Sequence, residues 1–467
     1  MRQLLASALL FFSAAGYSQT QPAATAEATT LNPIDTPDVS PGAQSQPADY
    51  GGPAILSRGG TASVGRGELL SFRPYVSLNG IYDSNLSTLS VDSNGLIPSN
   101  SGYGGEALIG VAGSHQWKRT LLDLDYRGSF RKYSQATYYD GTDQSLNLNV
   151  THQHSRQVTL EFGQTVARYS RSYFVPNGFT QMSYNPLTAS LTSNDLFDTP
   201  TNVFNSTGRM IYQKSARLAF GASGSGYLVR RRSEALAGLT GFGATGDMTY
   251  RVNRFSTIGV DYTFNHFGYT GLFGNSNIHG VSVNFASRLS KRWELALQLG
   301  GYRVESQTLT RVQLDPALEA IFGTGTGIGT VHAVSFGPRA AVRLTRAFRR
   351  GAWSMGYSRS VMPGNGVYLT STYDNAQAGF NYNGWRTVSL QGGVGYTRYN
   401  SLTQGIGHYQ NYSADGGASF KLSRYFSLIA RLGARRYDIS QTTYRRVAYR
   451  ATLGIAWSPG DYPLSIW

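Results

Sequence analysis

The sequence has no cysteine, few charged residues and no long apolar run, and each absence excludes a class of protein. Without cysteine there is neither a disulfide framework nor a thiolate metal site. Charged residues make up 14% of the chain, well below the usual quarter. The apolar run at residues 4–15 is too short to span a bilayer as a helix, and no later segment offers a longer one. Any membrane crossing must therefore be made by strands.

Apolar residues are instead found at alternate positions. Within residues 121–131, Leu122 and Leu124 alternate with Asp123 and Asp125. Side chains of a strand point to opposite faces with a period of two, so this segment has one apolar and one charged face. The pattern recurs from about residue 70 to 457, with no helical pattern left to cover the apolar faces. It predicts an all-β fold, an antiparallel up-and-down transmembrane barrel in the outer membrane of a Gram-negative bacterium.

The number of such segments predicts about 18 strands, with about 16 to 20 as the range. Their connections alternate between short ones, such as 213–214, and long ones, such as 306–330. Outer-membrane barrels have short periplasmic turns and long external loops, so we expect both termini in the periplasm. The longest loop, residues 169–199, is expected to fold into the lumen; an external flap is the alternative.

The ends of the chain differ from the alternating region. A basic residue, an apolar run and small residues predict a signal peptide over residues 1–18. Residues 19–69 have the composition of a disordered periplasmic leader, in which 50–67 form either a loose linker or a partial plug of the barrel mouth. The barrel is expected over residues 70–457 and a C-terminal tail over 458–467.

The net charge of +15 comes from basic residues scattered along the strands and turns, which argues against a nucleic-acid partner. On the polar face of the strands, about fourteen bases against about nine acids leave the wall of the lumen near +5, a field that favours anions. The arginines expected to line the pore are Arg127, Arg131, Arg209, Arg251, Arg339, Arg343, Arg431, Arg435 and Arg450.

The sequence predicts no catalytic residue, no metal site and no cofactor. His152 and His154 share a strand face but lie in an expected turn without a third ligand. His115 and His266 fall on the outward face, where a lipid-modifying enzyme could hold a base, but no serine partner is evident. We therefore predict that the protein is not an enzyme.

The segment 81–86 (Ile-Tyr-Asp-Ser-Asn-Leu), the Pro-rich leader and the aromatic chain end resemble the bacterial family named Putative beta-barrel porin 2. The resemblance covers about residues 70–467 and implies an outer-membrane porin. Some members of that family are associated with exopolysaccharide production, which would imply passage of a glycan. The chain departs from a simple barrel end, because Pro459 and Pro463 follow Trp457, and either Trp457 or Trp467 could be the assembly signal.

The main functional hypothesis is a channel for passive passage of small anionic or saccharide solutes. The alternatives are a non-conducting scaffold or surface protein and, third, a lipid-modifying enzyme. The expected partners are outer-membrane lipid, lipopolysaccharide, the barrel assembly machinery and small solutes. For the strand at 121–131 we predict that Arg costs about 2 to 4 kcal/mol at Leu124, on the lipid side, and almost nothing at Asp125, on the lumen side.

Overall fold

The computed structural model describes residues 64–66, 69–87, 99–134, 140–170, 200–232, 236–313, 326–364, 366, 369–382, 385–402, 407–440, 445–459 and 462–465. The signal peptide expected at 1–18 and most of the loop expected at 169–199 lie outside these residues. Within the described ranges, no helix long and apolar enough to cross a membrane is found.

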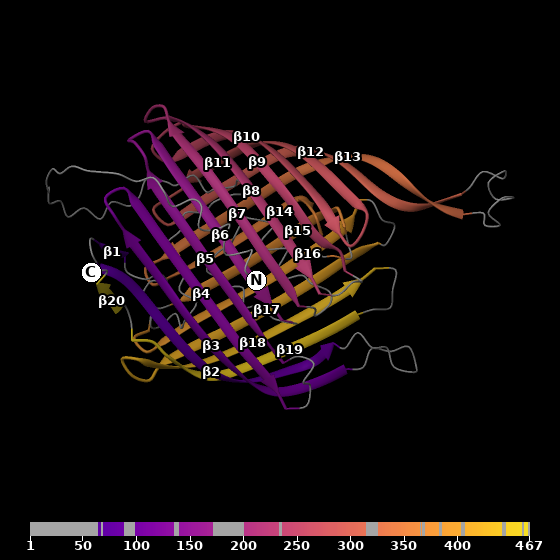
Figure 1. Ribbon diagram of the computed structural model, residues 1–467. Helices are drawn as coiled ribbons and strands as arrows, with labels where there is room; N and C mark the ends of the chain where they lie inside the picture. Colours follow the sequence, from indigo (N-terminus) through magenta and orange to yellow (C-terminus); the bar gives the residue numbers. More distant parts are fainter. Residues whose placement is uncertain are drawn as a thin grey trace. The chain divides into compact units, whose positions relative to one another are not determined.

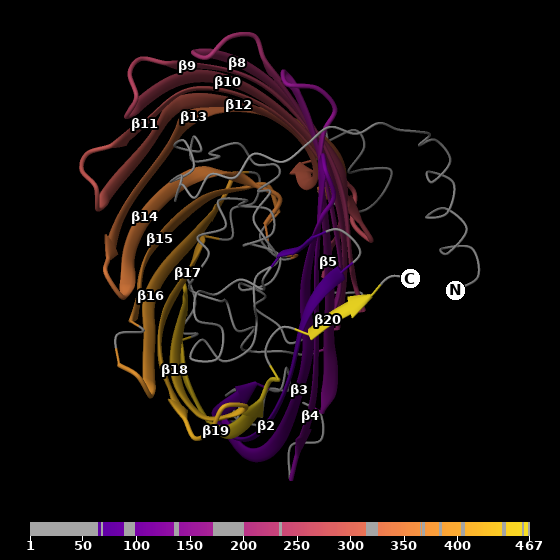
Figure 2. The ribbon, with the colours of Figure 1, turned by 90° about the vertical axis from the view of Figure 1, so that its left-hand side faces the viewer.

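Eighteen strands form a closed antiparallel ring, as the alternating pattern predicts. Each strand from β2 to β18 pairs with the next one, and β19 pairs with β2 to close the ring (Figure 2). The strands are β2 (Leu69–Ser87), β3 (Ser99–Gln116), β4 (Thr120–Tyr133), β5 (Gly141–Gln153), β6 (Val158–Tyr169), β7 (Thr201–Gln213), β8 (Leu218–Arg231), β9 (Gly238–Arg251), β10 (Ser256–Thr270), β11 (Gly274–Arg288), β12 (Trp293–Gln313), β13 (Thr326–Phe348), β14 (Gly351–Met362), β15 (Ser371–Tyr382), β16 (Val388–Ser401), β17 (His408–Lys421), β18 (Phe426–Ile439) and β19 (Arg445–Trp457).

The two faces of the wall follow the predicted alternation. In β10, Val260 and Tyr262 are exposed on the outside, whereas Asp261 and Thr263 are buried on the inside. The same division holds around the ring, where the exposed large apolar side chains share the outward parity. A closed ring with an apolar exterior satisfies every backbone group of the spanning strands without water. This is the architecture of an outer-membrane β-barrel.

Aromatic side chains mark the boundary of the apolar surface near the short turns. Trp293 packs edge to face on Trp353, with ring centroids 6.1 Å apart. The guanidinium of Arg346 lies 5.0 Å from the ring centres of both Trp293 and Phe348. Such amphipathic contacts are typical of the membrane interface.

The connections are short at one end of the ring and mostly longer at the other, where only residues 271–273 join β10 to β11. The expected loop over 306–330 is wrong at both ends. β12 continues to Gln313 and β13 begins at Thr326, so the two form a hairpin that extends beyond the neighbouring strands (Figure 1). β13 pairs with β14 only from Ala340 onward. The extension is stable as strand because β12 and β13 satisfy each other's backbone groups.

Two further short strands are not part of the eighteen-strand ring. β1 (Val64–Arg66) pairs in parallel with the end of β3, and β20 (Tyr462–Ser465) pairs with the start of β2. From the sequence, these residues are expected in the leader and the tail. β20 continues the edge of β2 beyond the place where β19 ends, and its Pro463 stands on such an edge, where proline is tolerated.

Candidate functional site

The inner face of the ring carries the polar and charged side chains, and its best-connected group is Asp261 on β10. This carboxylate accepts hydrogen bonds from Ser282 Oγ at 2.7 Å and Asn284 Nδ2 at 2.7 Å, both on β11. Gln298 Nε2 on β12 donates at 3.1 Å and Arg339 Nη1 on β13 at 3.2 Å. Four neighbouring strands thus converge on one buried anion, which holds the lumen groups in fixed positions.

The strand register explains how Arg339 reaches Asp261. Asp261, Ser282, Gly300 and Arg339 are consecutive partners in one row across β10 to β13. Gly300 has no side chain in this row, and a Cβ there would lie 2.0 Å from the carbonyl oxygen of Val281. The arginine therefore extends over a smooth stretch of wall to the acid three strands away.

A second charged cluster lies where the ring closes. Arg450 on β19 lies 3.7 Å from Asp83 of β2 and 3.4 Å from Glu106 of β3. The hydroxyl of Tyr133 on β4 donates to the same Asp83. Arg131 reaches Asp143 of β5 at 3.0 Å. Ion pairs therefore cross-link the strands on both sides of the closure.

Most of the nine arginines predicted to line the pore lie on the inner parity beside acids. Arg127 Nε is 2.8 Å from Asp125 Oδ2, and Arg209 Nη2 is 3.5 Å from Asp247 Oδ1. The remaining four lie on β9, β13 and β18: Arg251, Arg343, Arg431 and Arg435. Arg251 is exposed at the short-turn end, whereas Arg435 is buried and donates to the Tyr437 hydroxyl at 3.3 Å. Their role in a pore stays a prediction.

The ion pair at Asp125 corrects the expectation that Arg would be neutral there. Asp125 is 4% exposed and holds Arg127, so an Arg at this position would place two like charges together. At Asp125 the inner face is therefore less exposed to solvent than the alternating pattern alone indicates.

An apolar cluster occupies the lumen near the long-loop end, and the sequence analysis misses it. Tyrosines from β15 to β18 pack ring against ring, with centroids 5.0 to 6.0 Å apart. The cluster also contains Phe267 and Tyr269 of β10, Met362 at the end of β14 and Leu369 of the β14–β15 connection. The signal was present as inward-facing aromatic residues near the strand ends, but ordinary strand preference for aromatic residues explains each one singly.

The connection between β14 and β15 joins the two sides of this cluster. The Tyr269 hydroxyl lies 3.2 Å from the carbonyl oxygen of Pro363, to which it donates, and 3.0 Å from Thr370 Oγ1. The amide of Ala237 donates to the carbonyl oxygen of Gly366 at 3.0 Å. The connection therefore turns inward and narrows the lumen. The sequence predicts an inward loop at 169–199, which lies largely outside the described residues.

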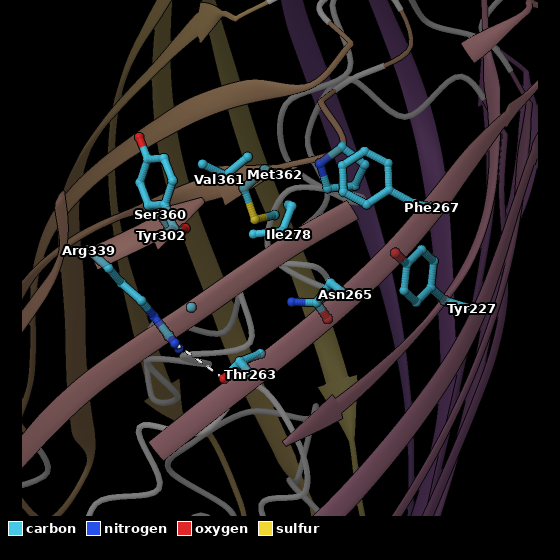
Figure 3. Close-up of a pocket in the computed structure, with 12 residues that line it drawn as sticks. Tyr227, Thr263, Asn265, Phe267, Ile278, Tyr302, Arg339, Ser360, Val361 and Met362 are labelled. Atoms are coloured by element: carbon cyan, nitrogen blue, oxygen red, sulfur yellow. Dashed lines mark hydrogen bonds between the residues drawn. The ribbon is translucent and has the colours of Figure 1, made fainter. Parts of the chain in front are cut away.

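A pocket lies between the Asp261 network and the apolar cluster. Arg339 and Thr263 form one side of it, and Phe267, Ile278 and Met362 form the other (Figure 3). With the open space at its mouth it measures about 550 Å³. Arg339 points toward Thr263 across the polar side, and their 3.3 Å hydrogen bond is the dashed line. The pocket combines one guanidinium, which is paired with Asp261, with apolar walls.

The histidines considered for catalysis lie apart from such chemistry. His266 Nδ1 is 2.7 Å from Asn277 Oδ1 on the outward face, so its ring is oriented by an amide. In the part of the chain that the structure describes, no serine hydroxyl bonds to that ring. His152 Nδ1 is 2.8 Å from Thr120 Oγ1, and no group of three metal-ligating side chains occurs among the described residues.

No family model matches the sequence, and a search of curated proteins gives no match. Solved structures with a similar trace are outer-membrane porins. OccK2 (OpdF) of Pseudomonas aeruginosa in complex with glucuronate is 11% identical, over 83% of this chain and 98% of that chain, with a TM-score of 0.42. OpdK of Pseudomonas aeruginosa with vanillate is 12% identical, over 84% of this chain and 99% of that chain, with a TM-score of 0.40. A BenF-like porin from Pseudomonas fluorescens Pf-5 is 12% identical, over 85% and 100%, at 0.41.

Proposed function

We propose that the protein is a passive channel for small anionic solutes, with its short turns and both termini on the periplasmic side. The observation that carries this proposal is the inner face of the ring, lined by charged and hydrogen-bonded side chains from Asp83 to Arg450. A ring of eighteen strands is too wide for side chains alone to fill, so water must occupy part of it. Polar groups so placed can contact a solute that passes through this water.

The preference for anions follows from the excess of bases over acids on the inner parity of the strands. On β17 and β18, Arg431 and Arg435 both lie near Asp415, and Arg431 also lies near Glu106. On β13, Arg339 and Arg343 both have the inner parity, with Ala341 between them. Low-dielectric walls focus the field of such a surplus along the lumen. Arginine also binds carboxylates in a bidentate manner, so an acidic sugar is the cargo that fits best, including one released during glycan export.

Reversal potentials in a planar bilayer at low salt test the proposal, because screening is weak there. We expect chloride to be preferred over potassium. Replacing Arg339, Arg343, Arg431 and Arg435 with Glu should move the potential toward potassium. Arg435→Gln and Arg436→Gln form a matched pair, since these neighbours on β18 have opposite parities. Only the first should shift the potential, and a cation preference of the unmodified protein would contradict the proposal.

The apolar cluster favours a second candidate, a non-conducting scaffold. Its side chains come from β6 to β18, and Pro363 and Thr370 of the β14–β15 connection contact Tyr269 within it. Liposome swelling with small sugars separates the two functions. Swelling supports the channel, and its complete absence, with or without residues 19–69, supports the scaffold.

A further inference from the structure

Two arginines on the outside of the barrel lie at the long-loop edge of the apolar surface, without an acidic partner among the described residues. Arg168 on β6 and Arg230 on β8 are exposed, and both have the outward parity of Val166 and Leu228. Among the described residues, neither takes part in an ion pair or a side-chain hydrogen bond. They are therefore charged groups at the membrane boundary to which no acid of the described residues is paired.

The register places these two arginines in one row. Asn202 on β7 is the partner of Arg168 on one side and of Arg230 on the other. Adjacent strands lie about 4.8 Å apart, so the two Cα atoms are about 10 Å from each other. Both side chains can reach a group above Asn202. No acid stands in this row, which continues through Gln144 on β5.

The row directly below is apolar. It runs through Leu146, Val166, Phe204 and Leu228, the next outward residues on the same four strands. From Val158 at the short-turn end to Arg168 there are ten residue steps, about 33 Å of strand. Tilted by about 40°, that length rises about 25 Å, the height of the apolar band of an outer-membrane barrel. Arg168 and Arg230 thus stand at the level of lipid headgroups.

Three other outward arginines near the long-loop end lie beside acids. Arg436 Nε is 3.1 Å from Asp438, and Arg359 Nη1 is 3.5 Å from Asp374. Arg303 is paired with Glu305 on its own strand. The unpaired row on β6 to β8 therefore differs in kind from the surface around it, and its charge is available to a ligand.

We infer that Arg168, Asn202 and Arg230 form a binding site for a phosphate group of lipopolysaccharide in the outer leaflet. The guanidinium groups hold the phosphate from both sides, and the amide of Asn202 donates between them. The acyl chains of the same glycolipid lie on the apolar row beneath. The inference rests on the proposed orientation, in which the long loops face outward.

The test measures lipid bound to the folded, full-length protein by native mass spectrometry. The probes are bis-phosphorylated lipid A, its dephosphorylated form and phosphatidylglycerol, with inorganic phosphate as competitor. We expect lipid A to bind and the dephosphorylated form to bind about tenfold more weakly. Arg168→Gln combined with Arg230→Gln should lower lipid A binding about tenfold, whereas Arg303→Gln combined with Arg436→Gln should change it less than twofold.

Several outcomes would overturn the inference. Equal binding of the phosphorylated and dephosphorylated forms would show that the acyl chains alone are recognised. Full binding by the Arg168/Arg230 double variant would place the site elsewhere. A preference for phosphatidylglycerol would show that this end of the barrel faces the inner leaflet, and that result would contradict the orientation while leaving the channel itself untouched. If the double variant fails to fold in a heat-modifiability gel, the single variants and the double Lys variant, which keeps the charge, take its place.

Discussion

Arginines on the inner and outer faces of this barrel differ in how their charge is balanced. Inside, Arg339 lies 3.2 Å from Asp261 and Arg209 lies 3.5 Å from Asp247. Outside, on β6 and β8, Arg168 and Arg230 have no acid beside them in the described structure. A charge enclosed by the barrel wall loses much of its hydration and needs a counter-charge. A charge at the edge of the membrane stays hydrated or pairs with a charged lipid headgroup. The face of the strand therefore decides what an arginine does.

The largest expected effect comes from removing an inner acid. Asp261→Ala should cost about 3 to 5 kcal/mol of folding free energy, because it leaves Arg339 buried and unpaired. The control is Asp438→Ala, whose partner Arg436 has a side chain that is 44% exposed. That exposed pair should contribute less than about 1 kcal/mol. Urea titrations in lipid vesicles compare the two, and equal costs would show that the inner and outer pairs are equivalent.

The next effect concerns an arginine introduced on either face. Leu299 is 64% exposed on the outside of β12, near the middle of the membrane-facing stretch, where Arg should cost about 2 to 4 kcal/mol. Ser225 on β8 points inward between Thr207 and Gly243, so an Arg there has room to reach water. We expect Leu299→Arg to lower the folded yield in vesicles much more than Ser225→Arg. The reverse order would mean that the faces are wrongly assigned.

The smallest effect concerns an outer arginine balanced by aromatic rings. Arg346 lies 5.0 Å from the ring centres of Trp293 and Phe348, and Arg346→Gln should cost about 0.5 to 1 kcal/mol. Arg349, which is exposed in the β13–β14 turn, is the control. Thermal unfolding of both variants measures the difference. If Arg349→Gln costs as much, the rings do not stabilise the cation.

The fold was largely predictable from the sequence, because the signal is local. The alternation of Leu122 and Leu124 with Asp123 and Asp125 already predicts a strand with one apolar and one polar face. When this pattern repeats about 18 times, a closed barrel is the arrangement that satisfies the backbone hydrogen bonds in lipid. The extension of β12 and β13 was not predictable in this way. It depends on the pairing of Gln313 with Thr326, which the residues of either strand do not indicate separately.

The candidate site was predictable in its residues but not in their contacts. The alternation selects Arg339 and Asp261 for the inner face, but they are 78 residues apart and meet only because Gly300 and Ser282 share their row. The inward turn of the β14–β15 connection likewise depends on a contact between Tyr269 of β10 and Thr370 of the connection, which are 101 residues apart in the sequence.

The sequence by itself determined which side of the wall each side chain faces, because that choice depends only on a period of two along one strand. Tertiary structure alone decided which charges meet. The register between strands brings Arg339 to Asp261 inside the barrel and leaves Arg168 and Arg230 on either side of Asn202 outside it. Register is set by hydrogen bonds between strands and by closure of the whole ring, so neither strand of a pair contains it alone.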